Sequence, residues 1–164
     1  MPESRLVGAK VPQVRIGEIV GGQLKTLRAN DAFATGRAVI VGMPGAFTPI
    51  CSEKHLPNLL SNADRLREAG FREIVCLVTS DPFAVDAWAA QLDPGRKVRF
   101  MSDGNLVFAR ALGLTTFEPR FFLGECSERY MLVLCDGVIE SVRIESSILE
   151  FSCTNVDDLV LEIA

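Results

Sequence analysis

Two short apolar runs with a helix-like segment between them constrain the fold of this chain most. The runs are AVIVG at residues 38–42 and EIVCLVT at residues 73–79, and both have the composition of buried central strands. Residues 50–69 form a helical pattern that stops at Gly70, and Pro57 predicts a kink inside it. A strand, a helix and a second strand in this order predict a βαβ unit in an α/β fold.

Turn residues and capping residues extend this unit into a mixed sheet. Gly21-Gly22 and Asp136-Gly137 each lie between two strand-like runs, which predicts two β-hairpins. Asp81-Pro82 and Asn155 are helix-start signals, and each precedes an amphipathic or apolar segment. We expect a central mixed β-sheet with helices on both faces, its further strands at residues 13–27 (two strands), 98–101, 130–135 and 138–144, and its last helix at residues 155–163.

Composition indicates a globular protein with a sizeable core. The chain has 164 residues, of which 48% are hydrophobic and 23% charged, and no linker or repeat divides it. We therefore expect one domain over residues 1–164. A net charge of −4 without a basic run makes nucleic acid an unexpected partner, and no apolar stretch is long enough to span a membrane. The N-terminus lacks the apolar core of a secretory signal. We expect a cytoplasmic protein, with a mitochondrial or other organellar location after processing as the alternative.

The cysteines indicate a reducing compartment rather than a metal site. There are five, at positions 51, 76, 126, 135 and 153, and no C-x-x-C pair occurs. Zinc sites usually use such pairs, and His55 is the only histidine of the chain. We expect no metal and no bound cofactor, and we expect most of the cysteines to pack as small hydrophobic residues.

Cys51 is the exception, because it follows the loop PGAFTPI where a helix begins. A helix N-terminus presents unpaired N–H groups and a partial positive charge, and both favour a thiolate. The hydroxyl of Thr48 can turn toward the sulfur or toward an oxygen that reacts with it. Pro44 and Pro49 stiffen the loop, and we expect Pro44 to shield one side of the pocket from water. The alternative is an ordinary buried cysteine with Thr48 as a helix cap.

The spacing Pro44-x-x-x-Thr48-x-x-Cys51 resembles the active-site signature of the peroxiredoxins. The longer segment GMPGAFTPICSEKHLP is similar to the peroxiredoxin-5 group, which includes the plant type II enzymes, and the likeness covers nearly the whole chain. It implies a thioredoxin-like fold and a thiol-dependent peroxidase that reduces hydrogen peroxide and alkyl hydroperoxides. It further implies a sulfenic acid on Cys51, recycling by thioredoxin or by glutaredoxin and glutathione, and a homodimer.

The same resemblance assigns further residues of the site. Arg129, at the start of the strand YMLVLC, matches the family arginine that stabilises the thiolate and binds the peroxide. Phe122 matches an aromatic residue of the substrate pocket, which we also expect Gly45 and Ile50 to line. Ile50 departs from the smaller or polar residue usual in the group, and it is expected to narrow the pocket.

Two cysteines match family positions that resolve the sulfenic acid. Cys153 matches the animal peroxiredoxin-5 type, and Cys76 matches a cysteine of the plant type II enzymes. A disulfide needs Cα atoms within about 7 Å. Cys76 lies in a strand that cannot easily shift, whereas Cys153 lies where local unfolding is cheapest. We therefore predict a Cys51–Cys153 disulfide that requires residues 145–154 to move; an external thiol is the alternative.

His55 leaves other classes of function open. It lies four residues after Cys51 on the same helix face, and a Cys–His pair also occurs in hydrolases and acyltransferases. An i,i+4 neighbour points alongside the sulfur rather than toward a substrate above it, so we expect His55 to pack or to orient. A third reading is a thioredoxin-fold redox sensor or chaperone module with little turnover.

Overall fold

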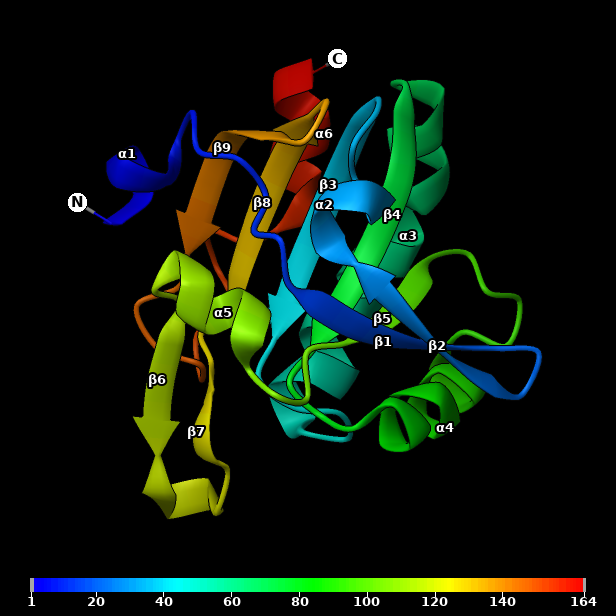
Figure 1. The fold of residues 1–164 in the computed structure, drawn as a ribbon, viewed down its shortest axis with the longest axis vertical. Coiled ribbons are helices and arrows are strands. Elements are labelled where there is room, and N and C mark those ends of the chain that lie inside the picture. Colours follow the sequence, from blue (N-terminus) through cyan, green and yellow to red (C-terminus); the bar gives the residue numbers. More distant parts are fainter. Residues whose placement is uncertain (1, 164) are drawn as a thin grey trace.

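A seven-stranded mixed sheet forms the centre of the computed structural model, which describes residues 2–163 (Figure 1). Its strands are β1 (Arg15–Val20), β2 (Gln23–Arg28), β3 (Arg37–Met43), β4 (Phe71–Val78), β5 (Arg99–Ser102), β8 (Tyr130–Cys135) and β9 (Val138–Ile144). They lie in the order β2-β1-β5-β4-β3-β8-β9. The strands β3, β4 and β5 are parallel, and β1 and β8 pair antiparallel at either side of them. The predicted mixed sheet is confirmed.

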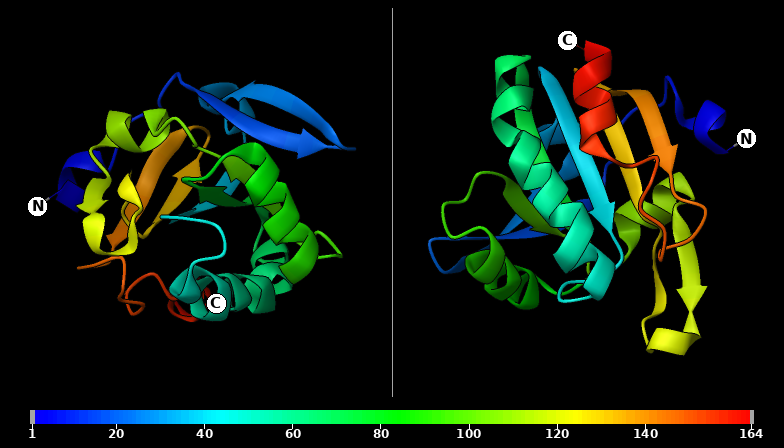
Figure 2. Two further views of the ribbon diagram at one scale, coloured as in Figure 1. Left: turned by 90° about the horizontal axis from the view of Figure 1, so that it is seen from below. Right: turned by 180° about the vertical axis from the view of Figure 1, so that it is seen from behind.

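Helices cover both faces of this sheet (Figures 1 and 2). One face packs against α3 (Leu56–Glu68), α4 (Pro82–Leu92) and α6 (Val156–Ile163), and the other packs against α1 (Pro2–Leu6), α2 (Ala29–Ala32) and α5 (Val107–Leu112). Successive residues of β3 alternate between the two cores, since Val39 and Val41 face the α3 side while Ala38 and Ile40 face the α5 side. This two-sided burial explains why β3 is apolar throughout. No helix within residues 2–163 has both the length and the apolar character that crossing a membrane would require.

The predicted turns and caps determine where several elements begin. Gly21 and Gly22 both have positive φ and join β1 to β2, and Asp136 and Gly137 do the same between β8 and β9. The Asp81 carboxylate accepts hydrogen bonds of 2.9 Å from two backbone N–H groups of the first turn of α4. These local signals are strong because each depends on a backbone geometry that few residue types favour.

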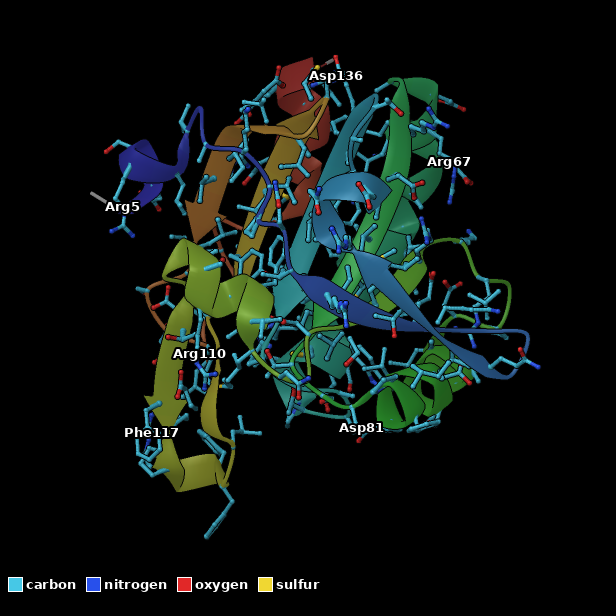
Figure 3. All side chains as sticks on the ribbon, viewed as in Figure 1. Arg5, Arg67, Asp81, Arg110, Phe117 and Asp136 are labelled. Atoms are coloured by element: carbon cyan, nitrogen blue, oxygen red, sulfur yellow. The ribbon has the colours of Figure 1, made fainter. Side chains whose placement is uncertain are left out.

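A short second sheet was not predicted. It consists of β6 (Thr115–Glu118) and β7 (Gly124–Ser127), joined by the 3₁₀ turn Pro119–Phe121. This hairpin extends away from the main sheet, and Phe117 lies on its outer part with 67% of its surface exposed (Figures 1 and 3). The four-residue strands lack the apolar runs by which the central strands are recognised.

The helix after β3 begins in an unusual geometry. Residues Cys51–His55 form a π-helical turn, and the α-helical hydrogen bonding of α3 begins at Leu56. Pro57, which was expected to kink the helix, comes directly after this π-helical turn, inside helical backbone that already begins at Pro49. Because proline has no N–H to donate to the preceding turn, the irregular hydrogen bonding lies where the sequence predicts a distortion. Single π turns of this kind often occur at functional sites.

Candidate active site

Cys51 lies at the carboxyl end of β3, where the sequence placed it. The loop at residues 44–48 leaves the strand, Pro49 and Ile50 are already helical, and Cys51 opens the π-helical turn. The Ser52 N–H donates to the Thr48 carbonyl at 2.9 Å and closes the first turn. The Cys51 side chain is fully buried in the core on the α3 side. The thiol is therefore held inside the first turn of a helix.

Trp88 supports this turn from α4. Its indole N–H donates to the Ser52 hydroxyl at 3.0 Å, and its ring meets Phe100 of β5 edge to face at 6.1 Å. The residue next to Cys51 is thereby tied to a second helix and, through it, to the sheet.

The pairing of β3 with β8 brings Arg129 to the same place. Tyr130 is opposite Gly42, so Arg129 lies beside the end of β3 although it is remote from Cys51 in sequence. Its Nη1 donates to Cys51 Sγ at 3.3 Å and to His55 Nδ1 at 3.0 Å. Its Nε and Nη2 both donate to the carbonyl of Ile148, at 3.2 and 2.9 Å. Four contacts fix the guanidinium plane against the sulfur.

The charge of Arg129 is buried without a carboxylate. Only 1% of its surface is exposed, and among residues 2–163 no Asp or Glu forms a salt bridge with it. A buried charge without a counter-charge is strongly destabilising. A Cys51 thiolate is the counter-charge within reach, so the pairing stabilises the thiolate and the guanidinium together.

His55 is the neutral partner in this arrangement. Burial and the Arg129 charge hold the pKa of His55 well below its ordinary value. Because an arginine has no hydrogen-bond acceptor and keeps its protons, His55 Nδ1 accepts from Arg129 and the ring hydrogen is on Nε2. The ring also packs against Phe151, with centroids 5.1 Å apart. His55 thus orients the guanidinium.

Of this group, Arg129 lines an apolar pocket of about 400 Å³, and the buried Cys51 and His55 do not. Thr48 lines this pocket, and its hydroxyl donates to the Gly45 carbonyl at 2.7 Å, which leaves the hydroxyl oxygen able to accept a further hydrogen bond. Other wall residues come from three separate loops. The pocket is lined by Pro44, Phe47, Thr48, Pro49, Ile50, Phe121, Leu123, Arg129, Ile148 and Leu149.

Two predicted pocket residues need correction. Phe122 is 95% exposed and does not line the pocket. It has a positive φ of 57° at the end of the 3₁₀ turn, which rotates its side chain outward, so Phe121 and Leu123 contribute instead. Gly45 lies behind the wall: a Cβ there would approach the Thr48 methyl group to 3.1 Å. Ile50 lines the pocket as expected.

The two candidate resolving cysteines differ in their surroundings. Cys76 is fully buried in β4, and its thiol lies 3.5 Å from Met43 Sδ. Burial, reinforced by the nearby Cys51, raises the pKa of Cys76 well above its ordinary value. Cys153 is exposed and donates to the Ile144 carbonyl at 3.3 Å. Burial of part of the thiol and the Glu145 carboxylate raise the pKa of Cys153.

Five pocket residues were missed by sequence reasoning. They lie in loops and turns, where no periodicity marks an inward-facing side chain, and they are Phe47, Phe121, Leu123, Ile148 and Leu149. The first belongs to the quoted active-site loop, and the other four come from the β6–β7 turn and the loop before α6. Only tertiary structure brings these loops together.

Comparison with known proteins finds relatives that match most of the chain. The Redoxin family matches residues 6–160. Mitochondrial peroxiredoxin-2F of Arabidopsis thaliana is 31% identical over 146 residues, which cover 89% of this chain and 73% of that protein.

Two solved structures share the whole fold. Reduced Prx3 of Vibrio vulnificus in complex with hydrogen peroxide superposes with a TM-score of 0.89 at 27% identity, over 96% of this chain and 94% of that one. Peroxiredoxin 5 of Alvinella pompejana gives 0.80 at 31% identity, over 96% of both chains. The central sheet and its helices are accordingly those of the thioredoxin-like fold. The chain belongs to the Redoxin family, within its plant type II and peroxiredoxin-5 group, and is a thiol-dependent peroxidase.

Proposed function

We propose that this enzyme reduces hydrogen peroxide and alkyl hydroperoxides with the Cys51 thiolate as the attacking group. The observation that supports this most is the shared Nη1 of Arg129, which contacts Cys51 Sγ and His55 Nδ1 in a site without a carboxylate. The sulfur attacks the terminal oxygen of ROOH and the O–O bond breaks. The leaving alkoxide takes up a proton to become ROH, and Cys51 becomes a sulfenic acid.

Three further residues complete the reaction geometry. The guanidinium of Arg129 stabilises the negative charge as it moves from sulfur to the leaving oxygen. The Thr48 oxygen accepts the hydrogen of the peroxide, and Pro44 closes the wall beside it. The rest of the pocket is apolar, which suits the carbon chain of an alkyl hydroperoxide.

The sulfenic acid is resolved by Cys153 in this proposal. The thiol of Cys153 attacks the Cys51 sulfur, the S–S bond forms, and hydroxide leaves with the thiol proton as water. Cys153 is exposed and lies in a loop, whereas Cys76 is fixed in a central strand. Thioredoxin, or glutaredoxin with glutathione, then reduces the disulfide.

The surroundings of the pocket suggest how the enzyme assembles. Phe47, Phe121 and Leu149 line it and are each 43–54% exposed, and Phe122 adds a fully exposed ring nearby. An apolar rim of this kind favours a homodimer that packs beside the active-site loop. For the location we propose the cytoplasm or, as the alternative, an organelle; the mitochondrial relative supports the alternative.

Reduction of peroxide by the purified protein tests the proposal. Single-turnover oxidation of Cys51 by hydrogen peroxide and by tert-butyl hydroperoxide is expected to be fast, followed by steady turnover with thioredoxin or with glutaredoxin and glutathione. Slow oxidation, or one turnover that neither reductant can follow, would favour the sensor reading. The hydrolase reading already conflicts with the site, because the Nδ1 lone pair of His55 is engaged by Arg129 and cannot act as a base.

A further inference from the structure

We propose that Glu145 is a positioning residue: its carboxylate holds the Cys153 turn closed and so sets how quickly Cys153 reaches oxidised Cys51. This inference rests on the proposed resolving role of Cys153. We call the hydrogen bonds between the Glu145 carboxylate and residues 152–154 the latch. The enzyme must keep this turn closed while peroxide reacts with Cys51 and must open it afterwards, so the strength of the latch affects the rate of disulfide formation.

One buried side chain holds both neighbours of Cys153. Glu145 follows the end of β9 and is 4% exposed. Its Oε1 accepts from the backbone N–H of Ser152 at 2.8 Å, from the N–H of Thr154 at 2.8 Å and from the Thr154 hydroxyl at 2.9 Å. Its Oε2 accepts from the Ser152 hydroxyl at 3.1 Å. The carboxylate therefore closes the loop from residue 145 to residue 154.

The latch is ionised although it has no cation beside it. Among residues 2–163 no Lys or Arg forms a salt bridge with Glu145. Burial by itself raises the pKa of Glu145, but the hydrogen bonds from Thr154 and Ser152 outweigh it and leave the pKa below its ordinary value. Hydrogen bonds to a charged acceptor are about twice as strong as neutral ones, so ionised Glu145 is the form that holds the turn.

The loop closed by Glu145 also supports the active site. The backbone N–H of Glu145 donates to the Arg129 carbonyl at 2.9 Å, the Ile148 carbonyl accepts from the Arg129 guanidinium, and Phe151 packs on His55. An open loop would remove these contacts from Arg129 and His55. A closed latch thus maintains the geometry in which Cys51 attacks the peroxide. Opening of the latch is required for Cys153 to form the disulfide with Cys51.

The far side of the turn is anchored separately. Asn62 donates to Asp157 at 2.7 Å, and the Val156 N–H donates to the Asn58 side chain at 2.8 Å, which ties the start of α6 to α3. The turn can therefore detach from Glu145 while α6 stays docked, with the bend between residues 154 and 156. Slow opening leaves the sulfenic acid exposed to a second ROOH, which converts it to sulfinic acid and releases ROH.

Amide hydrogen exchange of the reduced enzyme measures the latch directly. In Glu145→Gln the peptide that contains residues 145–154 is expected to exchange its amide hydrogens about tenfold faster. This factor is the loss of local stability expected when one charge-assisted hydrogen bond becomes neutral. Glu150→Gln removes the same charge from an exposed position of the same loop and is the matched control. Ser152→Ala removes the single bond to Oε2 from an exposed residue, and about threefold faster exchange is expected.

Formation of the disulfide is the second readout. After one equivalent of hydrogen peroxide and an acid quench, Glu145→Gln should form the Cys51–Cys153 link faster than the parent and accumulate less Cys51 sulfinic acid. Unchanged exchange in both Glu145→Gln and Ser152→Ala overturns the latch. Faster exchange with no Cys51–Cys153 link in any variant supports the latch and refutes the resolving role of Cys153.

Discussion

His55 Nδ1 accepts a hydrogen bond of 3.0 Å from Arg129 Nη1, the same nitrogen that donates to the sulfur of Cys51. Two residues of one helical turn thus hold a guanidinium group that comes from a distant part of the chain. This relationship requires His55 to be neutral, because a protonated ring has no acceptor and repels Arg129. The electrostatics of the site therefore depend on a buried histidine that does not line the pocket.

A pH dependence of stability follows from this neutral ring. The folded state holds the pKa of His55 well below 6.5, so at acidic pH the unfolded chain binds a proton that the folded chain does not. Stability is fully present above pH 6.5 and is lost as the pH falls, by about 1.4 kcal/mol per pH unit. Urea unfolding at pH 7.5 and 5.5 should show this loss, and His55→Gln should not. Equal losses in both proteins contradict the prediction.

The reaction itself should depend on Cys51 absolutely. Cys51→Ser replaces the attacking thiolate with a hydroxyl that is not ionised at neutral pH, so peroxide reduction should fall to the background rate. Cys126→Ser is the control, because Cys126 is buried in β7 and does not line the pocket. Peroxide consumption with thioredoxin in excess measures both variants. Residual turnover in Cys51→Ser would assign the chemistry to another cysteine.

Substitution of Arg129 or of Thr48 should slow the oxidation of Cys51 without unfolding the chain. Arg129→Lys keeps the charge but loses the planar fork that reaches Cys51, His55 and Ile148 together. Thr48→Val removes the oxygen that, in our proposal, accepts the hydrogen of the peroxide. Loss of one such donor or acceptor typically reduces a rate by about 10²–10³. Single-turnover oxidation of Cys51 measures the effect, with the exposed Arg110→Lys as control; a variant as fast as the parent is not part of the site.

Close packing of Gly42 against Tyr130 should make this glycine irreplaceable. A Cβ at Gly42 would lie 2.1 Å from the Tyr130 ring, far inside van der Waals contact, and the ring is buried in the core. Gly42→Ala is therefore expected to lower stability by about 1–3 kcal/mol or more and to disturb the adjacent Arg129. Gly95→Ala, where a Cβ meets no atom within 4 Å among the described residues, should be nearly neutral. Thermal unfolding compares the two; a stable Gly42→Ala would mean that β8 shifts freely.

Peptide mapping after one equivalent of peroxide should recover a Cys51–Cys153 disulfide. Cys153 is exposed in a loop, and Cys76 is hydrogen-bonded inside the sheet. A Cys51–Cys76 link, or no intramolecular link, would contradict the assignment and leave an external thiol as the resolving group.

The central fold could be predicted because its signals are local. The apolar runs of β3 and β4, the glycines between β1 and β2, and the Asp81 cap each depend on residues adjacent in sequence. The π-helical turn was missed since no simple residue pattern distinguishes it from an α-helical start. The β6–β7 hairpin was missed because its strands have four residues each and little apolar character.

The residues of the candidate site also divide into those that a local motif marks and those that only the tertiary structure brings to the site. Pro44, Thr48 and Cys51 lie in one motif, and Arg129 was assigned from the resemblance. The error at Phe122 arose from one positive φ, which exchanges the inward and outward positions of neighbouring residues and cannot be read from an aromatic pair. The contacts of Ile148 and Glu145 depend on how a long loop folds back on the sheet, for which the sequence has no periodic signal.

The hydrogen bond from Trp88 to Ser52 gives the protein an intrinsic optical reporter. Trp88 is the sole tryptophan of the chain, and its indole binds the residue that follows Cys51. Any displacement of the π-helical turn changes the surroundings of this one fluorophore. Emission of the unlabelled enzyme can therefore follow the state of its thiol in real time, and no second indole contributes to the signal.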